Sequence, residues 1–165
     1  MEAIIYNSNT GSTKKYALLL SDAVGIPALS LKEAKKSLKK GAEILYLGWV
    51  MASGVRGYHA VAERYRLVAV AAVGMAATGT GVETIREKNA IPRELPLFTL
   101  QGNFSPEKLS PPKRLLMRLL ENSLRKKVDR TPGEEETLRL MSVREERVRE
   151  ENLGALLAWY RAGQA

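Results

Sequence analysis

The order of apolar and amphipathic segments predicts an α/β fold: a doubly wound parallel sheet of five strands, in the order 2-1-3-4-5, with helices on both faces. Short apolar runs alternate with helical patterns, and the first run ends in a hydroxyl-rich loop that opens a helix. A length of 165 residues, of which 45% are apolar, suits one domain with a full core. Right-handed crossovers favour this strand order and place a ligand at the carboxyl ends of the strands.

Each expected element follows from its own pattern. Strands are expected at residues 3–6, 28–29, 43–49, 67–74 and 96–100. Helices are expected at residues 13–24, 32–38, 57–65 and 82–88. Strands this short and apolar are typical of a parallel sheet that is covered on both faces.

The chain after the fifth expected strand is longer than one closing helix requires. In this single domain, residues 1–165, we expect a basic helical extension at 105–141, whose first helix spans 113–127. Its apolar stripe is Leu115, Leu116, Leu119, Leu120 and Leu124, and its basic residues are Lys113, Arg114, Arg118, Arg125, Lys126 and Lys127. Two interpretations stay open: the leucines pack on the domain, or the helix is a basic amphipathic element that meets an anionic membrane or partner.

The C-terminal quarter predicts two more helices. Thr131-Pro132-Gly133-Glu134 is typical of a capping box with proline at the first helical position, which starts a helix that runs to about Met141. Residues 144–151 carry dense charge of both signs and are expected to be solvated. A closing helix against the sheet is expected from Leu153, Leu156, Leu157 and Tyr160, with Asn152 as its cap.

The loop after the first strand is the strongest candidate site. Ser8-Asn9-Thr10-Gly11-Ser12-Thr13 offers hydroxyls and backbone N–H groups to a phosphate, and the following helix adds unpaired donors and the positive end of its dipole. No Walker A string occurs, and the stretch 79–84 lacks the third glycine of a dinucleotide fingerprint. The alternative is an ordinary Ser/Thr-rich turn that caps a helix.

This loop resembles the phosphate loop of the flavodoxin family, [ST]-x-T-G-x-T directly after the first strand. The matching residues are Ser8, Thr10, Gly11 and Thr13. Residues 48–54, 97–104 and 108–110 are further similar to a subgroup near the menaquinone-dependent protoporphyrinogen oxidases. The resemblance covers essentially the whole chain and implies a flavodoxin-like fold with non-covalently bound flavin mononucleotide (FMN).

The resemblance also implies which residues hold the flavin. The phosphate would lie on Ser8, Asn9, Thr10, Gly11, Ser12 and Thr13. The ring would lie between the loops 49–58 and 74–81, against Trp49, Val50, Met51, Ala52, Ser53, Gly54, Tyr58, Gly74 and Met75. A flat ring is best covered by an aromatic ring or by methionine. The alternative is that Trp49 caps the core at a strand end and that Tyr58 is also a core residue.

The charge of the two loops predicts a preference for reduced flavin. Neither loop contains Asp or Glu, and Arg56 lies in the first. An anionic reduced flavin would therefore meet donors and positive charge, and the second loop leaves one ring face open or covered by methionine and backbone. The net charge of +8 favours an anionic partner and differs from the acidic character typical of shuttle flavodoxins.

Composition excludes several other chemistries. The absence of cysteine excludes disulfides, thiol catalysis and cysteine-ligated iron–sulfur clusters. One histidine, His59, gives no credible metal site, and we expect it to be solvated in the first turn of its helix. No nucleophile–base pair is evident, so no catalytic residue is named. The chain shows no signal peptide and no transmembrane run, which predicts a cytoplasmic protein, with a peripheral membrane location as the alternative.

The sequence therefore predicts an FMN-binding protein that transfers electrons between a donor and an acceptor it does not identify. One alternative is an FMN-dependent oxidoreductase like the protoporphyrinogen oxidases, which oxidises a tetrapyrrole precursor and passes electrons to a membrane quinone. Another is a module that binds a phosphate or nucleotide without redox chemistry. Nucleic acid is not an expected partner, because the basic residues are not interleaved with stacking aromatics.

Overall fold

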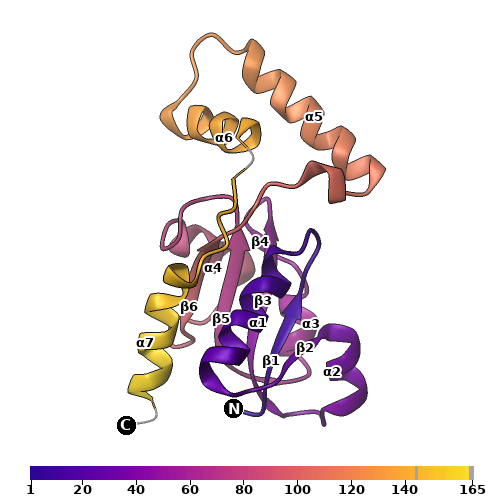
Figure 1. The fold of residues 1–165 in the computed structure, drawn as a ribbon, viewed down its shortest axis with the longest axis vertical. Coiled ribbons are helices and arrows are strands. Elements are labelled where there is room, and N and C mark those ends of the chain that lie inside the picture. The colour runs from indigo at the N-terminus through magenta and orange to yellow at the C-terminus, as the bar shows by residue number, and fades with distance from the viewer. Residues whose placement is uncertain (144, 164–165) are drawn as a thin grey trace.

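The computed structural model describes residues 1–143 and 145–163. Five strands run parallel in one sheet, in the order β2-β1-β3-β5-β6 (Figure 1). They are β1 (Ala3–Asn7), β2 (Ala28–Ser30), β3 (Glu43–Met51), β5 (Arg66–Gly74) and β6 (Leu97–Gln101). A sixth strand, β4 (Gly54–Val55), pairs antiparallel with β3.

The number and order of strands differ from the prediction. We expected five strands in the order 2-1-3-4-5, and the sheet has six, ordered β2-β1-β3-β5-β6 with β4 beside β3. The extra strand forms because Ala52 and Ser53 take φ values of 48° and 59°, which folds the chain into a tight hairpin after Met51. A strand of two residues is too short for its periodicity to be visible in the sequence.

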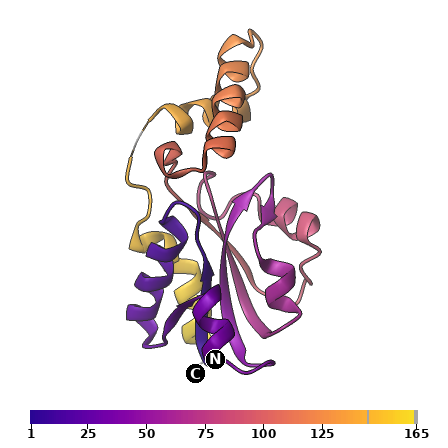
Figure 2. The same cartoon turned by 90° about the vertical axis from the view of Figure 1, so that its right-hand side faces the viewer.

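Helices cover both faces of the sheet, as predicted. Helices α1 (Ser12–Val24) and α7 (Gly154–Ala162) lie on one face, and α2 (Leu31–Ser37), α3 (Tyr58–Ala62) and α4 (Val82–Asn89) lie on the other (Figure 2). Consecutive residues of β1 enter opposite cores: Ile4 packs with Tyr16 and Leu20 of α1, whereas Ile5 packs with Ala34 of α2. This two-sided burial explains why the strand is apolar at every position.

The segment after β6 forms a separate helical lobe, which we define as residues 105–143. It contains a short 3₁₀ turn η1 (Pro106–Lys108), α5 (Pro111–Lys126) and α6 (Pro132–Ser142). The lobe stands beyond the carboxyl ends of the parallel strands (Figures 1 and 2). The predicted capping box of α6 is confirmed: Thr131 Oγ1 accepts from the Glu134 N–H at 3.3 Å, and the Glu134 carboxylate accepts from the Thr131 N–H at 2.9 Å.

The leucine stripe of α5 does not pack on the domain. Only Leu124 of the stripe is buried, on the side where α5 contacts α6. The other four leucines are exposed: Leu115, Leu116, Leu119 and Leu120. The interpretation that the stripe packs on the domain is therefore wrong for these four, because the lobe projects away from the sheet and leaves that face of α5 without a partner among the described residues.

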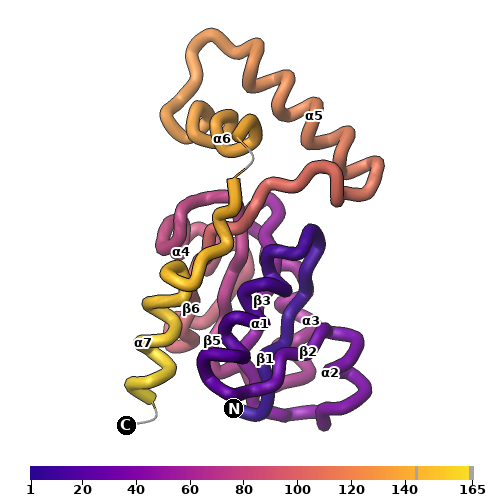
Figure 3. The backbone as a smooth tube through the Cα atoms, viewed as in Figure 1, coloured from indigo at the N-terminus to yellow at the C-terminus, as the bar shows by residue number. Residues whose placement is uncertain are grey.

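The chain leaves the sheet for the lobe after β6 and returns from it before η2 (Figure 3). The Asn103 side chain holds the leaving and returning segments together: its Oδ1 accepts from the Arg147 N–H at 2.7 Å, and its Nδ2 donates to Glu146 at 2.9 Å. Arg147 is buried, and its guanidinium donates to the carbonyls of Leu140 at 3.2 Å and Val143 at 2.8 Å. The expectation that residues 144–151 are solvated is therefore wrong at Arg147 and at Val148, which is also buried, while Arg144 lies outside the described residues.

The closing helix packs against the sheet as predicted, but its start differs. A 3₁₀ turn, η2 (Glu150–Leu153), precedes α7, and no side chain caps the helix. Asn152 instead donates to Tyr16 Oη at 2.6 Å and to the Arg147 carbonyl at 2.9 Å. The predicted cap is wrong because the Asn152 side chain bonds to Tyr16 of α1 and to the Arg147 carbonyl, and not to the first turn of α7.

Candidate functional site

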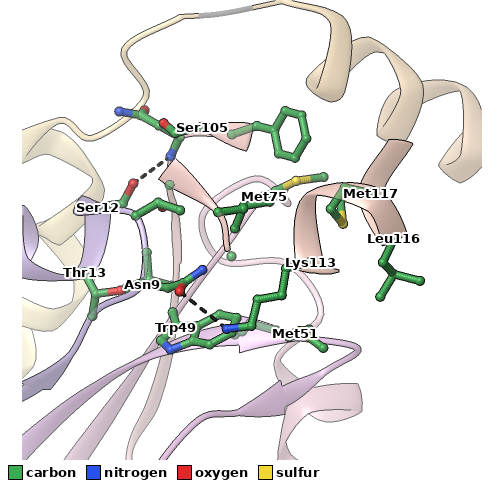
Figure 4. A pocket seen from close by; sticks show the side chains of 18 residues that line it. Asn9, Ser12, Thr13, Trp49, Met51, Met75, Ser105, Lys113, Leu116 and Met117 are labelled. Atoms are coloured by element: carbon green, nitrogen blue, oxygen red, sulfur yellow. Dashed lines mark hydrogen bonds between the residues drawn. The ribbon is translucent and has the colours of Figure 1, made fainter. Parts of the chain in front are cut away.

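A cleft of about 150 Å³ opens at the carboxyl ends of the strands, beneath the helical lobe (Figure 4). The strand register contributes to it: β1 ends at Asn7, opposite Gly48, whereas β3 continues to Met51, and β5 and β6 end together at Gly74 and Gln101. The β1–α1 loop therefore begins at a lower level than the loops that follow the other three strands. The cleft is lined by residues from five segments of the chain: Asn9, Thr10, Ser12, Thr13, Trp49, Val50, Met51, Val73, Gly74, Met75, Gly102, Asn103, Phe104, Ser105, Leu109, Lys113, Leu116 and Met117.

The loop between β1 and α1 forms one end of the cleft. The Gly11 N–H donates to Ser8 Oγ at 3.2 Å, which closes the loop into a turn, and Gly11 stands at the start of α1 with a φ of 109°. No described side chain caps α1, so the N–H groups of its first turn remain available to a ligand. Thr13 is buried in that first turn and also lines the cleft. The loop therefore has the donors and the dipole direction that suit an anion.

Gly102 and Asn103 brace this loop from the neighbouring strand. The Asn103 N–H donates to Ser12 Oγ at 3.0 Å. A Cβ on Gly102 would lie 3.0 Å from Val73 Cγ1 and 3.1 Å from Ser12 Cβ, so only glycine permits this approach without displacement. Both residues lie in the stretch 97–104, and neither was predicted to belong to the site. The one sequence feature that could have indicated Gly102 is a glycine directly after a buried strand, which often marks a close approach of the backbone.

Trp49 forms a side wall, and two cations contact its ring. Lys113 Nζ lies 4.6 Å from the centroid of the ring, and Arg56 Cζ lies 5.7 Å from it. Lys113 also donates to Asn9 Oδ1 at 3.5 Å, which links α5 to the β1–α1 loop (Figure 4). Contacts of this kind orient the ring and the lysine together. The role of Lys113 was missed, since the sequence pattern cannot tell which basic residue of the extension faces the cleft.

The rest of the wall is apolar and contains flexible methionine side chains. Three methionines line the cleft from three different elements: Met51 from β3, Met75 from the β5–α4 loop and Met117 from α5 (Figure 4). Unbranched thioether side chains adapt to a flat ring surface. Lys113 is the one charged residue in the lining, within the part of the chain that the structure describes. The cleft thus combines a positive end with apolar walls.

Several predicted site residues do not line the cleft. Ser8 and Gly11 belong to the loop but face shallower hollows on either side of it. Ala52 and Gly54 lie in the β3–β4 hairpin without lining the cleft, and Ser53 lines a hollow on the other side of Val50 and Met75. Tyr58 is 4% exposed and packs in the core on the α3 face, so the structure does not bring it to the remaining site residues. His59 beside it is exposed, as predicted.

Two buried tyrosines support the loops from below. The Tyr46 hydroxyl donates to the Arg56 carbonyl, and the Tyr16 hydroxyl donates to the Gln101 carbonyl. Burial raises the pKa of both hydroxyls above the ordinary value of tyrosine. Both side chains are therefore neutral donors at physiological pH. Tyr16 fixes the backbone directly before Gly102 of the cleft, and Tyr46 fixes the backbone at Arg56, whose side chain contacts Trp49.

The acidic group nearest the β1–α1 loop is already paired. Glu146 accepts from Lys15 Nζ at 2.7 Å and from Asn103 Nδ2 at 2.9 Å. The hydrogen bond from Lys15, with that from Asn103, lowers the pKa of the Glu146 carboxyl below its ordinary value. Its negative charge is thus compensated locally and adds little repulsion toward an anion in the loop.

Within residues 1–143 and 145–163, no group of three or more His, Cys, Asp or Glu side chains could hold a metal ion. No described helix has the length and apolar character needed to cross a membrane. No protein-family model, curated protein or solved structure matches this chain. The function is therefore inferred from the residues of the cleft.

Proposed function

We propose that this chain is a flavodoxin-like protein that binds FMN without a covalent bond and performs redox chemistry through it. One observation carries the proposal: a single cleft joins the β1–α1 loop, residues 49–51 and residues 74–75. These are the segments that the flavodoxin resemblance assigns to the phosphate and to the ring. A position at the carboxyl ends of parallel strands is where ligands bind in open α/β sheets.

The residues of the cleft fit such a cofactor. The uncapped first turn of α1 and the side chains of Thr10 and Thr13 would hold the phosphate. Trp49 and the methionines Met51 and Met75 would hold the ring. When bound, FMN supplies the capacity to accept and release electrons, and the protein supplies position and electrostatics.

The charge distribution supports a preference for the reduced cofactor. No acidic residue lines the cleft in the described chain, and Lys113 enters it from α5. A negative charge added to the cleft is therefore stabilised rather than repelled. Potentiometric titration of the FMN-loaded protein is expected to give a midpoint potential above that of acidic shuttle flavodoxins, and a potential as low as theirs would contradict this point.

A second candidate function has its own support. Five residues of the helical lobe line the cleft: Ser105, Leu109, Lys113, Leu116 and Met117. A roof that is apolar apart from one lysine and one serine suits a large apolar reaction partner with acidic groups better than it suits a small polar one. This favours an enzyme like the protoporphyrinogen oxidases, with a tetrapyrrole precursor and a membrane quinone, over a general electron carrier.

The first test is an absorption spectrum of the purified protein after incubation with FMN and removal of the excess. Bound FMN is expected in the wild type, and Thr10→Asp is expected to abolish it, because a carboxylate in the loop repels the phosphate. Lys113→Glu is expected to weaken FMN binding by about tenfold or more. Lys126→Glu is the matched control, since Lys126 lies at the far end of the same helix, and should leave binding unchanged.

Absence of FMN from the wild type would contradict the proposal. The loop would then be tested with inorganic phosphate and with nucleotides, and binding that Thr10→Asp removes would favour the non-redox module instead.

A further inference from the structure

The outer face of α5 is an apolar surface without a partner among the described residues. Leu115, Leu116, Leu119 and Leu120 follow one another at the spacing of neighbours on a helix. Their side chains are between 42% and 59% exposed. Leu124, one turn after Leu120, is buried, and α5 contacts α6. We call these four leucines the leucine face.

The leucine face begins at the cleft. Leu116 lines the cleft and is also 54% exposed, so it belongs to both surfaces. Figure 4 shows Leu116 and Met117 on the α5 segment beside the cleft, with Leu116 directed outward. Apolar surface is therefore continuous from the walls of the cleft to the outside of the lobe.

Positive charge flanks the leucine face. Residues 105–130 hold eight lysines and arginines against three acidic residues. Two of the cations are paired, Arg125 with Glu121 and Lys127 with Glu134, each at 2.7 Å. Arg118 and Lys126 are exposed and have no ion-pair partner within residues 1–143 and 145–163. An amphipathic helix with an apolar face and basic flanks suits the boundary between lipid headgroups and acyl chains.

The charge of the lobe also indicates which partner covers the leucine face. A second copy would bring one basic lobe against another, and the like charges would repel. A membrane-spanning role does not fit, because no described helix is long and apolar enough to cross a bilayer. An anionic bilayer satisfies both features at once, since its acyl chains take the leucines and its phosphates attract the basic flank.

We propose that α5 docks this protein on anionic lipid bilayers, with the leucine face in the headgroup region and the helix in the membrane plane. The docking rests on the lobe alone. Its consequence rests on the proposed function: because Leu116 belongs to both surfaces, docking places the mouth of the cleft at the lipid boundary. An apolar electron partner dissolved in the bilayer then reaches the cleft without crossing water.

The test is co-sedimentation of the full chain with vesicles of phosphatidylcholine alone and of phosphatidylcholine mixed with phosphatidylglycerol. Binding to the mixed vesicles only, weakened by salt, is expected. The double variant Leu115→Ser/Leu119→Ser is expected to bind at least about tenfold more weakly, because it loses apolar surface to bury. Leu18→Ser, at an exposed leucine of α1, is the matched control and should bind like the wild type.

A second variant tests the charge separately. Arg118→Gln/Lys126→Gln is expected to reduce binding to the anionic vesicles, because each basic residue near such a surface adds to the attraction. Neither double variant changes a residue of the cleft, so both should retain FMN to the same extent as the wild type. Circular dichroism should report unchanged helix content, since the replaced side chains are exposed.

Three results would overturn the docking proposal. The wild type could stay in the supernatant with anionic vesicles, or Leu115→Ser/Leu119→Ser could bind as well as the wild type. Self-association lost in that leucine variant, without vesicle binding, would assign the face to a second copy instead. Failure of the proposed function is separate: protein that sediments with anionic vesicles but never retains FMN supports docking and contradicts only the redox role.

Discussion

The sheet and the helical lobe use the same residue type in opposite ways. Leu47 of β3 is 0% exposed and packs between β-strands and the α1–α7 layer, whereas Leu119 of α5 is 58% exposed. The sheet is covered by helices on both faces, and the lobe consists of two helices that bury little between them: Leu124, Leu140 and Met141. Burial in the sheet therefore stabilises the fold, while apolar surface on the lobe is available for binding. The candidate site lies where the two regions meet.

The largest expected difference comes from one substitution made in each region. Leu47→Ala should lower the free energy of unfolding by about 2–5 kcal/mol, because it leaves a cavity in a closed core. Leu119→Ala should change it by less than about 0.5 kcal/mol, because its side chain is already solvated. Urea unfolding followed by circular dichroism measures both. Equal losses of stability would mean that the leucine face is buried and that the contrast between the regions is wrong.

The next effect concerns the junction between the regions. Arg147→Ala should cost about 1–3 kcal/mol, because the carbonyls of Leu140 and Val143 lose a charged donor in a buried place. Arg139→Ala removes an exposed ion pair with Glu136 and should cost much less, because solvent screens such a pair. Amide hydrogen exchange of α6 separates them: protection should fall sharply in the first variant only. Unchanged protection in Arg147→Ala would show that this arginine does not hold the lobe.

Replacing glycine by alanine should change stability in opposite directions in the two regions. Gly57 has a φ of 88°, and a Cβ there would lie 2.5 Å from Tyr46 Oη, so Gly57→Ala should destabilise by about 1–2 kcal/mol. Gly133, in the first turn of α6, has nothing within 4 Å of an added Cβ, and Gly133→Ala should stabilise the lobe by about 0.4–1 kcal/mol. Thermal unfolding gives the sign for Gly57→Ala, and hydrogen exchange gives it for α6. The same sign at both positions would contradict this contrast.

The smallest effect is a dependence on pH that is confined to the lobe. The hydrogen bond from Lys127, together with the Thr131 N–H, lowers the pKa of Glu134 to about 2. A lowered pKa means that Glu134 stabilises the folded lobe above the ordinary carboxyl pKa, near 4.5, and that this contribution is lost as the pH falls toward about 2. Glu134→Gln should reduce the change in α6 protection across that interval, and the remaining change belongs to Glu136, whose pKa the hydrogen bond from Arg139 also lowers. A wild-type profile identical to that of the variant would exclude this role.

The sequence predicted most of the sheet and its covering because those features are local and periodic. Consecutive apolar residues such as Ile4 and Ile5 indicated a strand buried on both faces, and Thr131 with Glu134 indicated a helix start, since each signal lies within a few residues. The β1–α1 loop was also predicted, and Asn9, Thr10, Ser12 and Thr13 do line the cleft. Whether the cleft holds FMN stays a prediction.

The remaining features depend on contacts between distant segments. Tyr58 follows a glycine-rich loop, which is where an aromatic residue that covers a flavin ring was expected. In the structure its side chain lies in α3 and packs in the core. Lys113 lies among several basic residues of one helix, and only the placement of the lobe brings it to Trp49. Asn152 has the character of a helix cap, but Tyr16 and the Arg147 carbonyl compete for its amide. A pattern along the chain does not show which distant residues the fold brings into contact with a given side chain.

The most direct test of the central claim, that the sheet and the lobe together form one FMN site, is amide hydrogen exchange of the wild type with and without FMN. We predict added protection in residues 9–14 of the sheet region and in residues 109–117 of the lobe, with none in α6. Protection in the loop but not at 109–117 would mean that the lobe takes no part in the site. Protection in neither segment would contradict the site altogether.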